Sequence, residues 1–338
     1  MVIETVRLPG QLALAPMAGV TDLAFRHVCR TFGASLTYTE MVSSKGLVFR
    51  DKKTATLLEK GEGETPMAAQ IFGSDPDTMA EAARIALELS GAEIIDINMG
   101  CPMPKIVNSG DGSALMKDIG RAEKVILSVR KAVKVPVTVK FRLGWDKGSK
   151  NYLEFADMCE SAGAAALCIH GRTRTQMYSG QADWFAIAEV KRQAKIPVIA
   201  NGDIMSGDAA VRALRITGAD MLMIGRGAMG NPWIFREIAG ALKGEVVSPP
   251  TVEERCGTVR SHIMHALRHK PEKVVLLEAR KHMAWYLKGL PHSRIYKDRI
   301  FSLSSVEDLI SLLERIRSDP QVNLPEENGT WASGVFKA

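Results

Sequence analysis

Eight short apolar segments, rich in Val, Ile, Leu, Met and Ala, recur along the first 230 residues with longer helical segments between them. Near-continuous apolar runs are typical of parallel strands that are covered on both faces, whereas strands with one solvated face alternate apolar and polar residues. The spacing between successive runs leaves room for a strand, a helix and two loops. The predicted strands are 12–17, 36–41, 67–72, 94–99, 137–142, 167–172, 198–203 and 221–226.

Helix-starting and helix-ending residues punctuate the segments between these strands. Asp75, followed by a proline, is a typical N-cap, and Gly91 and Gly218 are typical residues at the end of a helix. Asn231, also followed by proline, is predicted to open the last helix of the series, and Gly244 to close it. Eight such units predict an α/β fold, a closed (β/α)₈ TIM barrel. A doubly wound open sheet is the competing architecture.

After residue 244 the strand signal disappears and helical patterns follow one another. Thr251 and Glu254 have the Thr-x-x-Glu spacing of a capping box before the first of them. We therefore expect a barrel domain at 1–244, a small all-α helical-bundle domain at 245–320 and a loose tail at 321–338. The predicted helices of the second domain are 252–269, 272–288, 293–301 and 305–317.

Composition excludes several classes of protein. The 338 residues are 46% hydrophobic and 24% charged, which suits a large globular core. No apolar run reaches the roughly 18 residues of a membrane span, and the first residues lack a secretory signal pattern. The five cysteines have no Cys-x-x-Cys spacing, so neither a disulfide framework nor a metal site is indicated. We expect a cytoplasmic protein with no obligate protein partner.

Positive charge is concentrated in the helical region. Residues 255–299 contain eleven Lys and Arg against three Asp and Glu, although the whole chain carries a net charge of only +6. A concentrated positive field suggests a polyanionic partner. A solvated helical surface would explain the same charge without any partner.

Polar side chains, glycines and a thiol follow the predicted strands. In a TIM barrel the carboxyl ends of the strands meet at one rim, where active sites lie. Taken singly, Lys140 could be a rim salt bridge and His170 a structural histidine. As a set, the residues favour a functional site: Pro16, Met17, Ala18, Gln70, Asn98, Cys101, Lys140, Arg142, His170, Arg172, Asn201, Gly202, Asp203, Gly225 and Arg226.

The last two strands favour phosphate binding. Residues 225–230 spell G-x-G-x-x-G, but they follow the last strand rather than the first, so we reject a dinucleotide-binding fold. Glycine backbone amides, a following helix N-terminus and Arg226 would together hold a phosphate. With Gln70 at a ring edge and Lys140 near a pyrimidine, this set suits flavin mononucleotide (FMN).

These segments together closely resemble the bacterial tRNA-dihydrouridine synthases, especially the B-type branch. The most specific match is Ile-Asp-Ile-Asn-Met-Gly-Cys-Pro at 95–102, and the resemblance spans about residues 10–315. The other matching segments are 15–22, 139–145, 169–174, 199–204, 224–228, 232–235 and 279–287.

The resemblance implies a fold, a cofactor and residue roles. It implies that FMN is bound by Pro16, Met17, Ala18, Gln70, Lys140, Asn201, Gly202, Asp203, Gly225 and Arg226, with His170 close to the flavin. It also implies that NADPH reduces the flavin, with NADH as the alternative, and that no metal takes part. The flavin would deliver a hydride to C6 of a flipped-out tRNA uridine while Cys101 protonates C5. Asn98, Arg142 and Arg172 would contact the uracil.

The helical domain would hold the tRNA. On the predicted helix 272–288 four basic residues fall within about a 100° arc, and we expect them to contact phosphates: Lys273, Arg280, Lys281 and Lys288. The apolar residues of this helix are expected to pack the bundle: Val275, Leu276, Met283 and Leu287.

Two other functions stay open from the sequence. One is an FMN barrel that reduces a free small molecule, which would not need a basic helical appendage. The other is an RNA-binding protein in which the barrel is only a scaffold.

Overall fold

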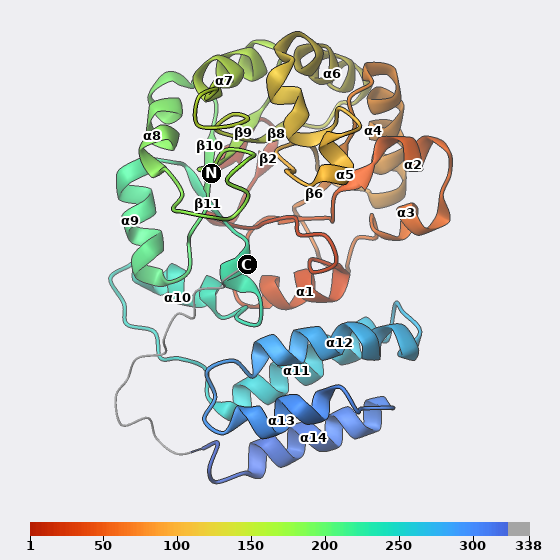
Figure 1. Ribbon diagram of the computed structural model, residues 1–338, viewed down its shortest axis with the longest axis vertical. Coiled ribbons are helices and arrows are strands. Elements are labelled where there is room, and N and C mark those ends of the chain that lie inside the picture. Colours follow the sequence, from red (N-terminus) through yellow and green to blue (C-terminus); the bar gives the residue numbers. More distant parts are fainter. Residues whose placement is uncertain (324–338) are drawn as a thin grey trace.

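Parallel strands form the wall of a barrel, and helices surround it (Figure 1). The computed structural model describes residues 1–323. The strands neighbour one another in the order β3, β11, β10, β9, β8, β7, β6 and β4. A parallel bridge between Ala13 and Leu36 joins the two ends of this order and closes the barrel, so the open sheet is excluded. The strands are β3 (Leu12–Leu14), β4 (Thr37–Tyr38), β6 (Met67–Phe72), β7 (Ile94–Met99), β8 (Val137–Arg142), β9 (Ala166–His170), β10 (Val198–Asn201) and β11 (Met221–Ile224).

Several strands are shorter than the sequence predicts. β3 ends at Leu14, so Pro16, Met17 and Ala18 belong to a loop. A further short strand, β5 (Val42–Ser43), pairs with β6 beyond the end of β4. Two strands that the sequence pattern missed, β1 (Val2–Ile3) and β2 (Val6–Arg7), form an antiparallel pair. Ile3 is fully buried in the apolar cluster inside the barrel, which explains why this segment is ordered.

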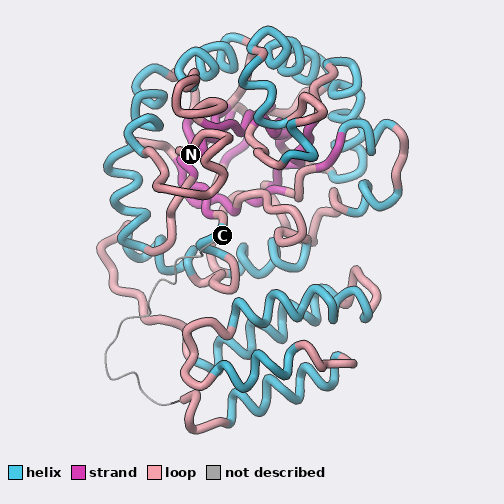
Figure 2. Tube along the Cα trace, in the orientation of Figure 1, coloured by secondary structure: helices cyan, strands magenta, loops and turns pink. Residues whose placement is uncertain are grey.

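Helices cover the outer face of the barrel (Figure 2). Asp75 accepts a hydrogen bond from Thr78 N and caps α4, while Gly91 ends that helix in the left-handed conformation. The last barrel helix begins at Ile234, three residues after the predicted start at Asn231. The helices are α1 (Leu23–Thr31), α2 (Ser44–Val48), α3 (Lys52–Thr56), α4 (Pro76–Ser90), α5 (Pro104–Val107), η1 (Gly112–Lys117), α6 (Ile119–Ala132), α7 (Tyr152–Ser161), α8 (Trp184–Gln193), α9 (Gly207–Thr217), η2 (Arg226–Ala228) and α10 (Ile234–Ala241).

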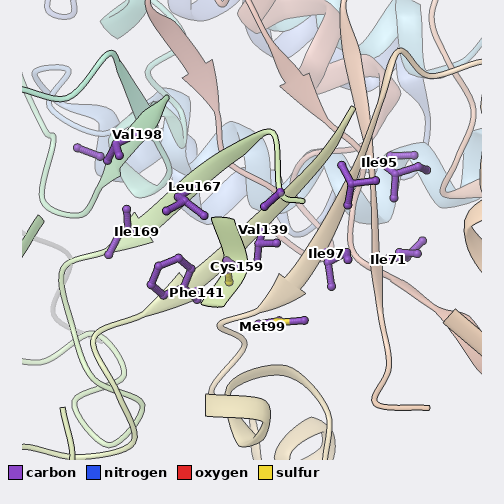
Figure 3. Packing of buried hydrophobic residues seen from close by; sticks show 14 of the residues in the cluster. Ile71, Ile95, Ile97, Met99, Val139, Phe141, Cys159, Leu167, Ile169 and Val198 are labelled. Atoms are coloured by element: carbon purple, nitrogen blue, oxygen red, sulfur yellow. The ribbon is translucent and has the colours of Figure 1, made fainter. Parts of the chain in front are cut away.

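Side-chain alternation divides each strand between two environments. On β7, Ile95, Ile97 and Met99 belong to the apolar cluster between sheet and helices (Figure 3). Because successive side chains point to opposite faces of a strand, Asp96 and Asn98 point into the barrel. The same alternation holds on β6, β8 and β9. It places six further side chains inside: Gln70, Thr138, Lys140, Arg142, Cys168 and His170.

The C-terminal region is a layer of four helices beside the barrel, next to α1 (Figure 1). Its own apolar core includes Val259, Ile263, Met283 and Leu313. The four predicted helices are therefore confirmed. They are α11 (Val252–Ala266), α12 (Glu272–Tyr286), α13 (Ser293–Ile300) and α14 (Val306–Ser318).

Only half of the predicted capping box forms at the start of α11. The Thr251 hydroxyl accepts a hydrogen bond from Glu254 N at 3.1 Å. The Glu254 carboxylate turns instead to Arg236 of α10, with Nη1 at 2.6 Å. This side chain therefore ties the helical layer to the barrel.

Polar contacts join the helical layer to the barrel. Lys270 Nζ lies 2.6 Å from Asp22, the N-cap of α1, and 2.6 Å from Glu278. Burial opposes ionisation of Asp22, but His262 and Lys270 outweigh it and lower the pKa of this carboxyl to about 2. Lys281 Nζ also donates to the carbonyl of Gly19 in the loop after β3.

Two further expectations concern a membrane span and the C-terminal tail. No described helix has the length and apolar character needed to cross a membrane. Most of the predicted tail at 321–338 lies outside the described residues, which end at 323.

A buried ion pair is expected to stabilise the start of the barrel. Arg26 Nε lies 2.7 Å from Glu64, and both side chains are at most 4% exposed. We predict that Glu64→Ala lowers the free energy of unfolding by about 3–5 kcal/mol, because the guanidinium then stays buried without its carboxylate. Urea denaturation measures the change.

The control for that experiment is Glu81→Ala. It breaks the Arg84–Glu81 pair, in which both side chains are about half exposed. Exposed pairs contribute at most about 1 kcal/mol. Equal effects of the two substitutions would contradict a stabilising role for the buried pair.

Candidate active site

A cavity of about 500 Å³ opens at the carboxyl ends of the barrel strands. Residues on or directly after seven of the barrel strands line it, although they are far apart in the sequence. The structure brings together thirteen of the residues expected from the sequence: Pro16, Met17, Ala18, Asn98, Cys101, Lys140, Arg142, His170, Asn201, Gly202, Asp203, Gly225 and Arg226. Gln70 and Arg172 are not among the lining residues.

The loop after β3 is held in shape from three directions. The Thr21 hydroxyl accepts from Met17 N at 2.9 Å and donates to Met17 O at 3.2 Å. Gly19, at φ +69°, donates its N–H to the carboxylate of Glu40. Its carbonyl accepts from Lys281, so the helical layer is tied to a loop of the cavity wall.

The backbone of Cys101 is fixed on both sides. Asn98 Oδ1 accepts from Gly100 N at 3.1 Å and from Cys101 N at 2.9 Å. The carbonyl of Cys101 accepts from the hydroxyl of Ser113 at 2.8 Å. The strand end therefore presents the thiol to the cavity in a defined position.

The electrostatics around the thiol favour its protonated form. Burial raises the pKa of the Cys101 thiol above its usual range, although the charges of Arg142 and Lys140 oppose this. Since the net shift is upward, the group carries a proton at neutral pH. A protonated thiol is an acid rather than a nucleophile.

Arg142 organises the rim next to Cys101. Its Nε donates to Gly100 O at 2.8 Å, and its Nη1 donates at 2.9 Å to Thr173 O and to Met177 O. Nη2 makes no hydrogen bond within the described part of the chain and so stays available to a ligand. Burial lowers the pKa of Arg142 to about 10, which still leaves it charged at neutral pH.

Lys140 is not a rim salt bridge. Its Nζ lies 3.3 Å from Asn201 Oδ1, and within residues 1–323 it has no carboxylate within 4.0 Å. Asn201 in turn donates to the carbonyl of Met223 at 2.8 Å. Burial lowers the pKa of Lys140.

His170 lies among positive groups. Burial lowers the pKa of this imidazole well below 6.5, and the charges of Arg142 and Lys140 act in the same direction. The ring is therefore neutral at pH 7.

Gln70 and Arg172 lie behind the cavity wall. Gln70 is fully buried and bonds to Asn98 and Asp96. Arg172 is 1% exposed and binds Asp203 at 2.7 Å and the carbonyl of Gly180 at 2.6 Å. Asp203 also accepts from Arg226 at 3.3 Å, so Arg172 acts on the cavity through Asp203.

The structure adds lining residues that the sequence analysis missed. Tyr178 lies under the Arg226 guanidinium, with 4.9 Å from Cζ to the ring centroid. It follows the sixth barrel strand by eight residues, too far for a strand-end search. Besides the expected Met17, five methionines line the cavity: Met41, Met103, Met205, Met223 and Met229. Their spacing carries no signal, because each comes from a different loop or strand.

The lining fits a flavin. A volume of about 500 Å³ lies in the range of cofactor sites, and the polarizable methionines suit a flat aromatic ring. Backbone crowding requires glycine at two positions of the expected phosphate grip. A Cβ on Gly202, at φ +124°, would lie 2.7 Å from Ala182 Cβ, and one on Gly227 would lie 2.4 Å from Ile204 O.

Two expectations concern the helix N-terminus at the phosphate loop and the absence of a metal. A 3₁₀ turn, η2, follows Gly225, so the expected helix N-terminus at this loop is replaced by the turn, and α10 begins only at Ile234. Among residues 1–323 there is no group of three or more His, Cys, Asp or Glu that could hold a metal ion.

The four basic residues expected on this helix do not share one free face, and Lys288 lies two residues after the end of α12. Lys273 and Lys288 are exposed. Arg280 donates to the carbonyl of Leu303 at 2.9 Å, within the helical layer. Lys281 points to Gly19 of the barrel. Adjacent residues of a helix point about 100° apart, which explains this division.

Known proteins resemble this chain along most of its length. The dihydrouridine synthase (Dus) family model matches residues 13–320. The tRNA-dihydrouridine synthase B of Pasteurella multocida is 42% identical over 315 residues, which cover 93% of this chain and 95% of that protein. The tRNA-dihydrouridine synthase B of Pseudomonas aeruginosa is 42% identical over 318 residues, covering 94% and 95%.

Solved structures share the fold at low sequence identity. A 2-naphthoyl-CoA reductase in complex with 2-naphthoyl-CoA has a TM-score of 0.57 at 12% identity, covering 72% of this chain and 52% of that one. Histamine dehydrogenase from Rhizobium sp. 4-9 has a TM-score of 0.54 at 11% identity, covering 78% and 50%. These likenesses show the fold alone, whereas the family match and the relatives cover nearly the whole chain. The chain belongs to the dihydrouridine synthase family.

Proposed function

We propose that this protein is a flavin-dependent tRNA-dihydrouridine synthase that binds FMN, is reduced by NADPH (or alternatively NADH) and reduces uridine in tRNA in the cytoplasm. One observation carries the proposal most directly: a protonated thiol, that of Cys101, faces the same cavity as Lys140 and the glycine-lined Arg226 loop. The names of the relatives support the substrate.

The proposed reaction combines a hydride transfer with a proton transfer. Saturating the C5–C6 bond of uracil takes a hydride at C6 and a proton at C5. A bound, reduced flavin supplies the hydride. Cys101 supplies the proton, because its raised pKa keeps it protonated at neutral pH. The charges of Arg142 and Lys140 then stabilise the thiolate until solvent returns a proton.

Different residues of the cavity wall would bind different parts of FMN. Lys140 and Asn201 would hold polar atoms of the ring, and Gly225 with Arg226 would hold the phosphate. The expected contacts of Pro16, Met17, Ala18, His170, Gly202 and Asp203 are compatible with their place on the cavity wall. Gln70 stays a predicted flavin ligand, although its amide is engaged with Asn98 and Asp96 here.

The uracil would enter between the thiol and the flavin. Arg142 Nη2 is available there, whereas Asn98 already uses its oxygen for the Cys101 loop and donates to Gln70. Arg172 would act on the uracil only indirectly, because it lies behind Asp203. A base can reach this depth only after it is unstacked and flipped from the RNA.

The helical layer would hold the rest of the tRNA. Lys273 on α12 and Lys288 just after it are exposed and would contact phosphates. Lys281 would contribute by tying this layer to the loop at Gly19, and Arg280 by packing within it. The RNA would thus be bound beside the cavity mouth.

We predict that Cys101→Ala keeps FMN and its reduction by NADPH but loses at least about 100-fold in uridine reduction, the usual contribution of a general acid. Dihydrouridine formed on unmodified tRNA measures the loss, and flavin bleaching under anaerobic conditions measures the first half-reaction. Cys256→Ala, which removes a buried thiol of the helical layer, is the control. Wild-type turnover by Cys101→Ala on tRNA would refute the acid role.

We predict that Arg226→Gln lowers FMN affinity about 10- to 100-fold, because a charge-assisted hydrogen bond to the phosphate is lost. Reconstitution with FMN, followed by flavin absorbance per protein, measures the affinity. Arg212→Gln, at an exposed arginine of α9, removes the same charge outside the cavity and should retain FMN. Equal FMN occupancy in both variants would show that Arg226 does not bind the phosphate.

We predict that Lys273→Glu weakens tRNA binding and makes the affinity less sensitive to salt, because fewer counterions are then released. Filter binding at several salt concentrations measures both. Lys124→Glu, on α6 at the opposite end of the molecule, reverses an equal exposed charge as the control (Figure 1). Equal losses in the two variants would mean that only net charge matters.

A further inference from the structure

A buried chain of hydrogen bonds runs behind the cavity wall and ends at Cys101. Gln70 of β6 and Asp96 of β7 are direct partners in the strand register. Gln70 Nε2 donates to Asp96 Oδ2 at 2.7 Å, and Gln70 Oε1 accepts from Asn98 Nδ2 at 2.9 Å. Asn98 Oδ1 then accepts from Cys101 N at 2.9 Å. Asp96 and Gln70 are fully buried.

The two ends of this chain require the same direction of every bond, because the carboxylate can only accept and the backbone N–H groups of Gly100 and Cys101 can only donate. An ionised carboxylate can only accept, so the NH₂ group of Gln70 must turn to Asp96. The oxygen of Gln70 then faces Asn98, which must present its own NH₂ group. Only in that orientation does the oxygen of Asn98 meet the N–H groups of Gly100 and Cys101. A reversed Asn98 would place two donors against each other.

We propose that Asp96 is a positioning residue for the proton donor: its buried carboxylate anchors the amides of Gln70 and Asn98, and through them the loop that presents Cys101 to the cavity. Asp96 itself does not line the cavity. It therefore acts through its neighbours rather than on a bound molecule. This role deepens the proposed function, but its effect on the Cys101 loop does not depend on that function.

The groups around Asp96 determine the pH at which its carboxyl loses its proton. From β8, Thr138 donates to Oδ1 at 2.5 Å and Lys140 is the nearest positive group. Tyr38 of β4 and Cys168 of β9 also feel its charge, and both stay neutral because burial raises their pKa values. Burial raises the pKa of Asp96 to about 6, despite its hydrogen bonds to Thr138 and Gln70. Above pH 6 the carboxylate therefore dominates, and below pH 6 the acid does.

The test compares Asp96→Asn with Thr138→Val in the holoenzyme. Asparagine has the same shape, but its neutral amide oxygen accepts a weaker hydrogen bond from Gln70 than a carboxylate does, so the chain loses its charged anchor. Valine removes a different hydrogen bond of the same carboxylate and leaves Gln70 as the donor. The readout is the rate at which iodoacetamide alkylates Cys101, followed by peptide mass spectrometry. The other four cysteines are buried and give no competing signal.

At pH 8 we expect Cys101 of Asp96→Asn to react about fivefold faster than in the wild type, and Thr138→Val to react at the wild-type rate. Below pH 6 the wild type and Asp96→Asn should converge, because the wild-type carboxyl is then protonated as well. A merely structural role would not produce this convergence. Equal rates at pH 8, in two variants that both retain the wild-type melting temperature, would overturn the proposal.

A kinetic measurement separates this inference from the proposed function. On tRNA we expect Asp96→Asn to lower kcat about fivefold with little change in KM, and Thr138→Val to shift the acid limb of kcat to higher pH. If the alkylation rates are as expected but even the wild type reduces no uridine in tRNA, the positioning role stands and the proposed function fails. If uridine is reduced but alkylation is unchanged, the positioning role fails alone.

Discussion

The alternation of side chains along closed, parallel strands is the constraint on which the site depends. It sends Asp96, Asn98, Lys140 and Arg142 into the barrel while their neighbours pack against the helices. Inside the barrel these side chains are shielded from water, so burial and neighbouring charges shift their pKa values. Burial therefore keeps the thiol of Cys101 protonated and the ring of His170 neutral, whereas Arg142 stays charged. The result is a positive cavity that holds a protonated thiol, which suits an anionic cofactor and a substrate that becomes an anion before it is protonated.

The second constraint lies at the junction of the barrel and the helical layer. The peptide of Gly19 is held on one side by Glu40 of the barrel and on the other by Lys281 of α12. Asp22, three residues further on, is held by Lys270. The loop that forms one wall of the cavity thus depends on the helices that would bind RNA. Binding of a large substrate to the helical layer and the shape of the cavity therefore both depend on the contacts of Gly19 and Asp22.

The strands, the closed barrel and most of the cavity wall could be predicted from sequence, because apolar runs and strand-end residues are local signals. Gln70 lies within β6 and Arg172 lies two residues after β9, but which side chains separate them from the cavity depends on packing across strands. Tyr178, Met41, Met103, Met205 and Met229 come from loops whose path no local pattern specifies. The division between Arg280 and Lys281 likewise depends on a tertiary contact, with Gly19, that lies 262 residues away in the sequence.

The central claim is that Cys101 is a protonated acid held at the cavity, and the titration of its thiol tests this most directly. The rate of alkylation of Cys101 as a function of pH reports the fraction of thiolate. The account predicts a midpoint above the ordinary value of 9.0, because burial outweighs the nearby charges of Arg142 and Lys140. A midpoint near or below pH 7 would show a thiolate at physiological pH and would contradict the account.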